Sequence, residues 1–366
     1  MFGRRNKQAQ SAGHQAKQVQ VAGDLVVVQG VTEERASEIA RAEVVRVAEQ
    51  FTEEAHQKAL ENGQALADRL LEAMAGRPEL LAAFASPSFQ STYVKAQFCA
   101  AGTDSAQDHE LLTSLLTERA SRDEARIRLA VDRAVQTIDQ LDDQSLAGLT
   151  LFWFADRIAP AAAEPLVGLA ALETLAANLL TIAPVPSEHS RKWSADLDIL
   201  DCVRVEGALA GLKPFEEYLC SRLPGYVSAG FTGDEIPAVQ AAIAELATPI
   251  EVVPHALVQD RFRLNIRESG DAFIRSRSDT DDLPPDADRL RAVLDLARHD
   301  EQFPSASEGL SERIERSYPA LNQVRLFWNG IHGVIEITPV GVAIAFCNAR
   351  RAHNLDSLGS LADQLR

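Results

Sequence analysis

Residues 110–141, ELLTSLLTERASRDEARIRLAVDRAVQTIDQL, carry the most regular pattern in the chain. Apolar side chains recur there at steps of three and four, which places them on one stripe of an α-helix. They are Leu111, Leu112, Leu115, Leu116, Ile127, Val131, Val135, Ile138 and Leu141. Charged residues four positions apart lie between them, Arg119 and Asp123 for example, as is typical of a solvated helix face. We therefore expect a helical region whose charged side lies at the surface.

Composition places the chain among ordinary globular proteins. It has 366 residues, 46% of them hydrophobic, so it can bury a core, and two domains are more plausible than one. A net charge of −17 disfavours a general binder of nucleic acid or anionic membranes, because such polyanions repel an acidic protein. The 4 cysteines form no CxxC pair and no signal peptide is recognised, so we expect a reducing cytoplasm.

The first residues divide into a tail and a short β unit. Residues 1–17 contain basic side chains and no acid, which is typical of a flexible tail. Residues 18–31 form the β unit, in which QVQVAGDLVVVQG at 18–30 predicts two short strands separated by a Gly-Asp break. Its apolar β-forming residues are the candidate self-association site: Val19, Val21, Leu25, Val26, Val27 and Val28.

This β unit needs a partner edge, because two strands of about five residues cannot close a sheet alone. One alternative is intramolecular, with the C-terminal strand predicted at residues 334–337 as the partner. The other is the same segment in a second copy, since unpaired strand edges template pairing between chains. We favour the second, because the tail before the unit and the charged helix after it separate the unit from the core.

Residues 32–183 are predicted to form a helical domain. Thr32 precedes two glutamates, and Thr52 repeats this arrangement. A threonine cap followed by acids in the first turn is typical of a helix start, so we expect one helix to begin at each position or one long helix to bend there.

The end of this domain is strongly apolar. Residues 145–160 are apolar on nearly every side, so we expect them to form the buried centre, with Trp153 inside it. Residues 165–185 are about long enough to span a membrane, but Glu173 lies in their middle. A carboxylate there costs roughly 2.5 to 3.5 kcal/mol on insertion, so we expect a packed soluble helix instead.

A linker is predicted at residues 183–193, which contain Pro and Ser and no periodicity, so we place a second, mostly helical domain at 194–366. Helices are expected in its first part near residues 195–212, 214–222 and 235–247. Residues 257–267 fit a helix and a strand equally well. Five arginines between 261 and 277 are interspersed with acids, and we interpret them as a mixed-charge surface.

The sequence carries no local motif for chemistry. It lacks GxxxxGK[ST], GxGxxG, GxSxG and HExxH, and the acidic run at 278–288 lacks the glycine and final glutamate of a calcium loop. We therefore assign no catalytic, cofactor-binding or metal-ligating residue, and expect a protein that is not an enzyme and has no cofactor. An active site assembled from distant residues leaves no such motif, so this expectation stays open.

The C-terminal end has a recognisable order. Residues 321–328 predict a helix, residues 331–337 a strand, and Thr338 with Pro339 the start of a final helix. This order resembles the wing and last helix of winged-helix modules, many of which bind DNA. Residues 309–366 are nearly neutral, so contact with protein is favoured over contact with DNA. The expected fold class is mainly α: a multi-helix body with a short N-terminal β unit and a small C-terminal winged-helix-like α+β end.

Several segments, taken in order, resemble an uncharacterised bacterial family with placeholder locus names. They are QVQVAGDLVVVQG, TEERASEIARAEV, FQSTYVKAQFCAAGTDSAQDHELLTSLLTERA, LDDQSLAGLTLFWF and IEITPVGVAIAF. The resemblance covers most of the chain and supplies no activity or catalytic residue. It implies a bacterial cytosolic protein, with phage defence or mobile elements as the setting.

Three functions follow as hypotheses. The first is a non-enzymatic scaffold, sensor or adaptor that self-associates through its N-terminus as a homo-oligomer and contacts protein partners. The second is a regulator whose C-terminal module touches DNA, although nucleic acid is a disfavoured partner overall. The third is a membrane-active effector that exposes residues 145–185, although a membrane is also disfavoured.

Overall fold

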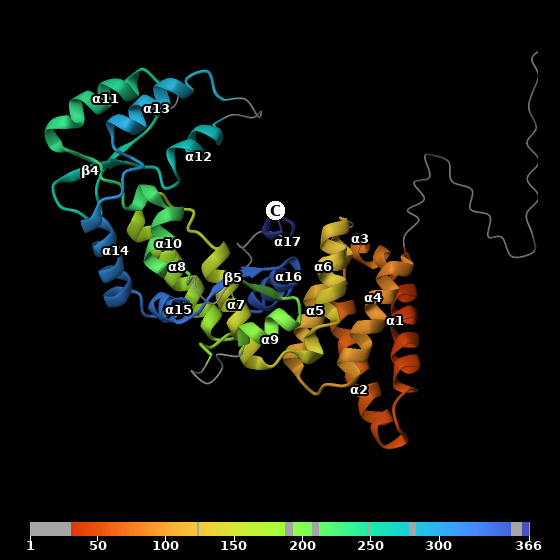
Figure 1. Cartoon of the computed structure of the whole chain (residues 1–366). Helices are drawn as coiled ribbons and strands as arrows, with labels where there is room; N and C mark the ends of the chain where they lie inside the picture. The colour runs from red at the N-terminus through yellow and green to blue at the C-terminus, as the bar shows by residue number, and fades with distance from the viewer. Residues whose placement is uncertain are drawn as a thin grey trace, which may run out of the picture.

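The computed structural model describes residues 31–122, 124–186, 193–206, 212–246, 249–277, 283–352 and 361–365. The predicted tail and nearly all of the predicted β unit, including its six self-association residues, lie outside these ranges. The described chain is mainly helical with a few small antiparallel sheets, as predicted (Figure 1).

The first half of the chain is helical throughout. Its helices are α1 (Glu33–Ala48), α2 (Glu53–Met74), α3 (Pro78–Leu81), α4 (Pro87–Ala101), α5 (Ala106–Ser121), α6 (Ala125–Val135), α7 (Asp143–Arg157) and α8 (Pro165–Leu180), with 3-10 turns at Ala82–Ala85 and Ile138–Gln140. The two predicted starts are confirmed. Thr32 caps α1 by accepting the Arg35 N–H at 3.2 Å, and α2 begins directly after Thr52.

The predicted helical region at 110–141 is divided between α5 and α6. Its apolar stripe is buried as expected, but its charged face is not all surface. Arg119 is only 4% exposed, and it donates to Ser88 Oγ at 3.0 Å and to Asp132 Oδ1 at 3.3 Å. The surface prediction for Arg119 was wrong because tertiary partners on α4 and α6, rather than a neighbour on its own helix, hold the guanidinium.

The buried centre is the packing of α7 against α16 (Pro339–Ala349). Trp153 is fully buried, as predicted, and meets the Phe346 ring edge to face at 6.1 Å. Thr150 and Asn348 add one buried hydrogen bond of 2.9 Å between the two helices. None of the helices in the described ranges combines the length and the apolar character needed to cross a bilayer.

Glu173, the acid in the middle of α8, has a structural partner. Its two carboxylate oxygens accept the N–H groups of Ala320 and Leu321, at 3.0 and 2.8 Å. These groups lie in the first turn of α15 (Pro319–Asn329), where no residue of the same chain segment caps them. The charge that interrupts an apolar segment therefore caps a neighbouring helix.

The second half mixes helices with short strands. Its elements are α9 (Trp193–Ile199), β1 (Val203–Glu206), α10 (Phe215–Arg222), β2 (Phe231–Thr232), α11 (Ile236–Ala244), β3 (Val252–Pro254), β4 (Arg261–Leu264), α12 (Gly270–Arg275), α13 (Ala287–Leu296), α14 (Pro304–Ser317), α15, β5 (Val334–Ile337), α16 and α17 (Leu361–Gln364), with 3-10 turns at Pro224–Tyr226 and Gly233–Glu235. The helix predicted at 195–212 was wrong at Val203–Glu206, because the β-branched pair in β1 joins a sheet. The ambiguous residues 257–267 contain a strand, β4.

Two small sheets form from strands that are distant in sequence. β1 pairs antiparallel with β5, and β4 lies between β2 and β3 in the second sheet. The predicted C-terminal order of α15, β5 and α16 is present, with Thr338 capping α16. The partner of β5 is β1, about 130 residues earlier in the chain, and a winged-helix module stays a prediction.

The described residues bury two main hydrophobic cores. The larger extends from α1 to α17 and includes α7 and α16. The smaller lies among β2, β4, α11, α12 and α13, which gather at one end of the molecule (Figure 1). The predicted division near residues 183–194 stays a prediction, and α8 before it packs on α15 after it.

Candidate functional site

Of the two partner edges predicted for the N-terminal β unit, the structure describes one. The unit itself, with Val19, Val21, Leu25, Val26, Val27 and Val28, lies outside the described residues. The strand predicted at residues 334–337 is β5. The hydrogen bonds of β5 determine whether one of its edges is free to pair with another strand.

The pairing of β5 with β1 leaves the other edge of β5 open. The Thr338 N–H donates to the Cys202 carbonyl at 3.1 Å, so these two residues form a hydrogen-bonded pair. Hydrogen-bonded and non-hydrogen-bonded pairs alternate along antiparallel strands, so Ile337 and Ile335 belong to non-hydrogen-bonded pairs. Their own N–H and C=O groups therefore point away from β1. Among the described residues, no hydrogen bond reaches these outward N–H groups.

The outer edge of β1 is different. The Val205 N–H points away from β5 and donates to the Asp198 carboxylate at 3.1 Å. Asp198 belongs to α9, which packs along β1. Within the part of the chain that the structure describes, this two-stranded sheet therefore has one edge occupied by a helix and one open edge.

A groove of about 570 Å³ follows the open edge. All four residues of β5 line it on one side, and Asp156, Arg157, Tyr218 and Arg222 line it on the other. Successive side chains of a strand point to opposite faces, so a hollow that touches four in a row runs along the strand's edge. The groove is therefore placed beside the unpaired backbone groups.

Hydrogen bonds at the end of α7 hold the far wall of this groove in place. The Tyr218 hydroxyl donates to the Asp156 carboxylate at 2.7 Å, and the Arg222 guanidinium donates to the Asp156 and Arg157 carbonyls. The Tyr218 ring also stacks on Trp328 with ring centroids 4.8 Å apart. Burial is the largest cause that raises the pKa of Tyr218 to about 12, and the hydrogen bond to Asp156 is the next. The hydroxyl therefore stays a neutral donor. This wall is therefore preformed, with the Asp156 carboxylate held by Tyr218 and Arg157.

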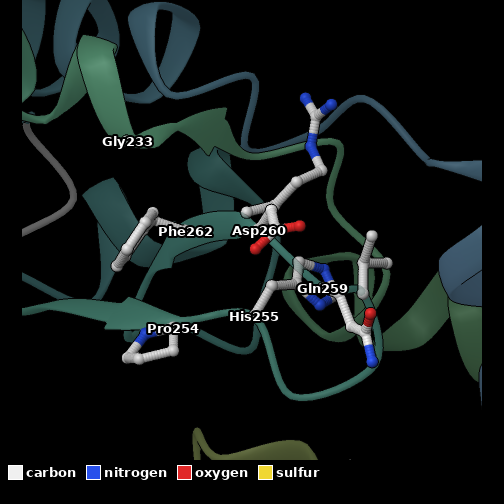
Figure 2. A pocket seen from close by; sticks show the side chains of 8 residues that line it. Gly233, Pro254, His255, Gln259, Asp260 and Phe262 are labelled. Atoms are coloured by element: carbon white, nitrogen blue, oxygen red, sulfur yellow. The ribbon is translucent and has the colours of Figure 1, made fainter.

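A second hollow, of about 500 Å³, lies beside β3 and β4 and includes His255 (Figure 2). The imidazole is 5% exposed, accepts the Leu257 N–H at Nδ1 and donates from Nε2 to the Ser228 carbonyl at 3.1 Å. Burial lowers the pKa of His255 to about 4, so it is neutral at physiological pH. Both ring nitrogens are used by the backbone, which leaves neither for acid or base catalysis.

The other polar groups of the His255 hollow are also engaged or exposed. The Arg261 guanidinium donates to the carbonyls of Ala229 and Gly230 at 2.6 and 3.1 Å, and lies over the Phe303 ring. Asp260 is exposed in a left-handed turn, with φ of 57°. This arrangement fixes a loop, and no pair of side chains in it has the geometry of a nucleophile and its base.

The arginines predicted as a mixed-charge surface include a buried one. Arg263 is 1% exposed and donates to the carbonyls of Gly225, Leu264, Ile266 and Ala163, at 2.6 to 3.1 Å. Burial lowers its pKa from the ordinary value. The surface prediction for Arg263 was wrong, because carbonyl oxygens of loop segments, which have no sequence signature, solvate this guanidinium.

The cysteines and acids form no metal centre in the described part of the chain, where no group of three or more His, Cys, Asp or Glu side chains could hold an ion. All 4 cysteines are free thiols. Burial raises the pKa of Cys202 and of Cys347 to about 12, which keeps both thiols protonated and unreactive.

Comparison with known proteins completes the description of the chain. No curated protein matches it, and no solved structure does. The profile of one protein family, which carries a placeholder locus name, matches residues 30–359. The chain therefore belongs to this uncharacterised family, for which no function is established.

Proposed function

We propose that the protein is a non-enzymatic scaffold, sensor or adaptor of the bacterial cytoplasm, which self-associates through residues 18–30 and contacts protein partners. The observation that supports this proposal most is the open edge of β5 beside a preformed groove. Such an edge recognises backbone, which is what a strand of another segment or another chain presents.

The contents of the hollows agree with binding better than with catalysis. His255 and Arg261 are held by the backbone in one hollow, and Tyr218 and Arg222 are held by the end of α7 in the other. Groups held in this way shape a surface, whereas a reaction needs a group free to exchange a proton or attack a substrate. A setting in phage defence or mobile elements remains a proposal that comes from the family resemblance.

Removal of residues 1–30 tests the proposal. We expect the remaining chain to keep its helical circular dichroism and cooperative unfolding, because both main cores are built from later residues. Its mass by light scattering should fall from that of an oligomer toward that of the monomer. An equal mass for the full-length and truncated proteins would refute self-association through this segment. Unfolding of the truncated chain would favour intramolecular pairing instead.

DNA contact through the C-terminal end has less support. Three arginines of this end are paired with carboxylates: Arg325 with Glu216 at 2.6 Å, Arg350 with Glu118 at 2.5 Å and Arg351 with Glu110 at 3.0 Å. Phosphate contacts would have to compete with these pairs. The winged-helix interpretation of this end is still a proposal, which a salt-dependent shift of a labelled duplex would support.

Membrane activity also has less support. Exposure of residues 145–185 would require α7 to leave the centre of the larger core, where Leu149, Leu151 and Trp153 have no solvent exposure. Leakage from liposomes tests this alternative directly.

A further inference from the structure

We propose that residues 25–28 of one copy of the chain add as a third strand to the open edge of β5 in a second copy. This inference rests on the proposed function and deepens it, because it names the surface that receives the N-terminal segment. The occupant is the apolar sequence LVVV, and the acceptor is the groove between β5 and the wall formed by Tyr218, Arg222 and the end of α7.

The backbone chemistry of the β5 edge favours the addition of a strand. Ile335 and Ile337 present N–H and C=O groups away from β1, and the described part of the chain offers no acceptor to these N–H groups. Unpaired groups along a strand edge are a template for another strand. β1 cannot serve in the same way, because Asp198 already accepts the outward N–H of Val205.

The shape of the groove also fits an added strand. A paired strand would lie 4.7 to 4.9 Å from β5, within a hollow of about 570 Å³ whose far wall is already fixed. Hollows of roughly 300 to 1,000 Å³ are the usual size for sites that enclose a bound group. LVVV has apolar side chains on both faces, so it needs cover on both faces, as buried central strands do. A groove with two walls meets this need better than a flat, exposed edge.

The donor strand must come from a different copy of the chain. Only residues 29 and 30 separate LVVV from Val31, where the described chain begins, and three residue steps reach at most about 10 Å. From Val31 the chain enters α1, which packs on α4; α4 packs on α6, α6 on α16, and α16 beside β5. Packed helices are about 8 to 10 Å apart, so helices that stand in a row between α1 and β5 place β5 beyond that reach. Figure 1 shows α4, α6 and α16 between α1 and β5.

The experiment uses the full-length protein with a broken donor strand, Val26→Pro with Val27→Pro. Adjacent N–H groups of a strand point to opposite edges, so one of the two prolines removes a ladder donor in either register. A fluorescent peptide of residues 18–31 is then titrated into this variant. The matched controls are the peptide carrying the same two prolines and a full-length variant with Ala9→Pro and Gln10→Pro, outside the β unit.

We expect the broken-donor variant to lose oligomeric mass and the Ala9→Pro, Gln10→Pro control to keep it. The native peptide should bind the broken-donor variant saturably at one peptide per chain, and the proline peptide should not bind. Bound peptide should slow hydrogen exchange at the Ile335 and Ile337 amides by on the order of tenfold or more, with no such change at Val205.

Three results would overturn the inference, and they are distinguishable. If the wild-type protein is an oligomer and the native peptide does not bind the broken-donor variant, the segments pair with each other and only the acceptor assignment fails. If the wild-type protein is a monomer at all concentrations, the proposed function fails with it. Binding that leaves exchange at Ile335 and Ile337 unchanged also refutes β5 as the acceptor.

Discussion

The α7–α16 centre and the junction of the smaller core with the helical body are held together by different forces. At the centre, Trp153 and Phe346 pack as apolar rings, and the Trp153 Nε1 has no hydrogen-bond partner. At the junction, polar side chains reach the residues just before α8. Tyr226 donates to Ala162 O at 2.5 Å, Arg263 donates to Ala163 O at 2.6 Å, and Arg267 donates to Pro160 O.

The contrast between the apolar centre and the hydrogen-bonded junction shows where this fold accepts polar side chains in its interior. Burial of apolar surface stabilises the centre in proportion to area and needs no particular partner. The junction instead depends on a few donors to loop carbonyls, and Arg263 serves four of these carbonyls. Loss of a ring should therefore weaken the whole molecule, whereas loss of a donor should loosen one end of it.

The largest effect is expected for Trp153→Ala, which tests the apolar half of this comparison. The substitution leaves a cavity at a fully buried site, so it should lower the free energy of unfolding by about 3 to 5 kcal/mol. Urea denaturation followed by circular dichroism measures the change. Trp153→Phe is the control and should cost less, because it keeps a ring and removes an unpaired N–H. A loss below about 1 kcal/mol for the alanine variant would show that this centre is not core.

An intermediate effect is expected for Arg263→Met, which tests the polar half. The carbonyls of Gly225, Ile266 and Ala163 lose their shared donor, but a buried charge is also removed, so we expect a net cost of about 1 to 3 kcal/mol. Limited proteolysis should cut near residues 225–300 before it cuts elsewhere. The same change at the exposed Arg275 is the matched control and should stay within about 0.5 kcal/mol. Equal effects at the two positions would contradict the role given to Arg263.

The smallest effect on stability at neutral pH is expected for His255, whose contribution depends on pH. Its pKa is about 4 in the folded chain and near 6.5 when unfolded, so the unfolded chain binds the proton first. The contribution of His255 should therefore be constant above pH 6.5, and stability should fall as pH drops from 6.5 toward 4. Comparison of urea midpoints with His255→Gln at pH 7, 6 and 5 isolates this residue. A constant difference between the two proteins across this range would show that His255 does not titrate as described.

Much of the helical fold could be predicted from sequence because the forces behind it are local or periodic. The caps at Thr32 and Thr338 and the burial of Trp153 follow from neighbours within a few residues. The partner of β5 could not be predicted, since β1 lies about 130 residues away and its four residues read equally well as the end of a helix.

The polar residues of the interior were missed for a related reason. Arg119 and Arg263 are charged side chains among other charged residues, which is the usual pattern of a surface. Their burial depends on Asp132 and on loop carbonyls that only the folded chain brings near. The open groove along β5 is likewise a property of packing, and its only signal in the sequence was the predicted strand itself.

Asp198 makes the two edges of the two-stranded sheet different from each other. With α9 and this carboxylate against β1, each molecule offers one acceptor position, so strand donation would proceed at a fixed ratio of one segment per sheet. Donation from each copy to the next would build an open chain whose length rises with concentration, and reciprocal donation would close a dimer. In either case the occupied edge of β1 would keep a further strand from adding to the sheet on that side.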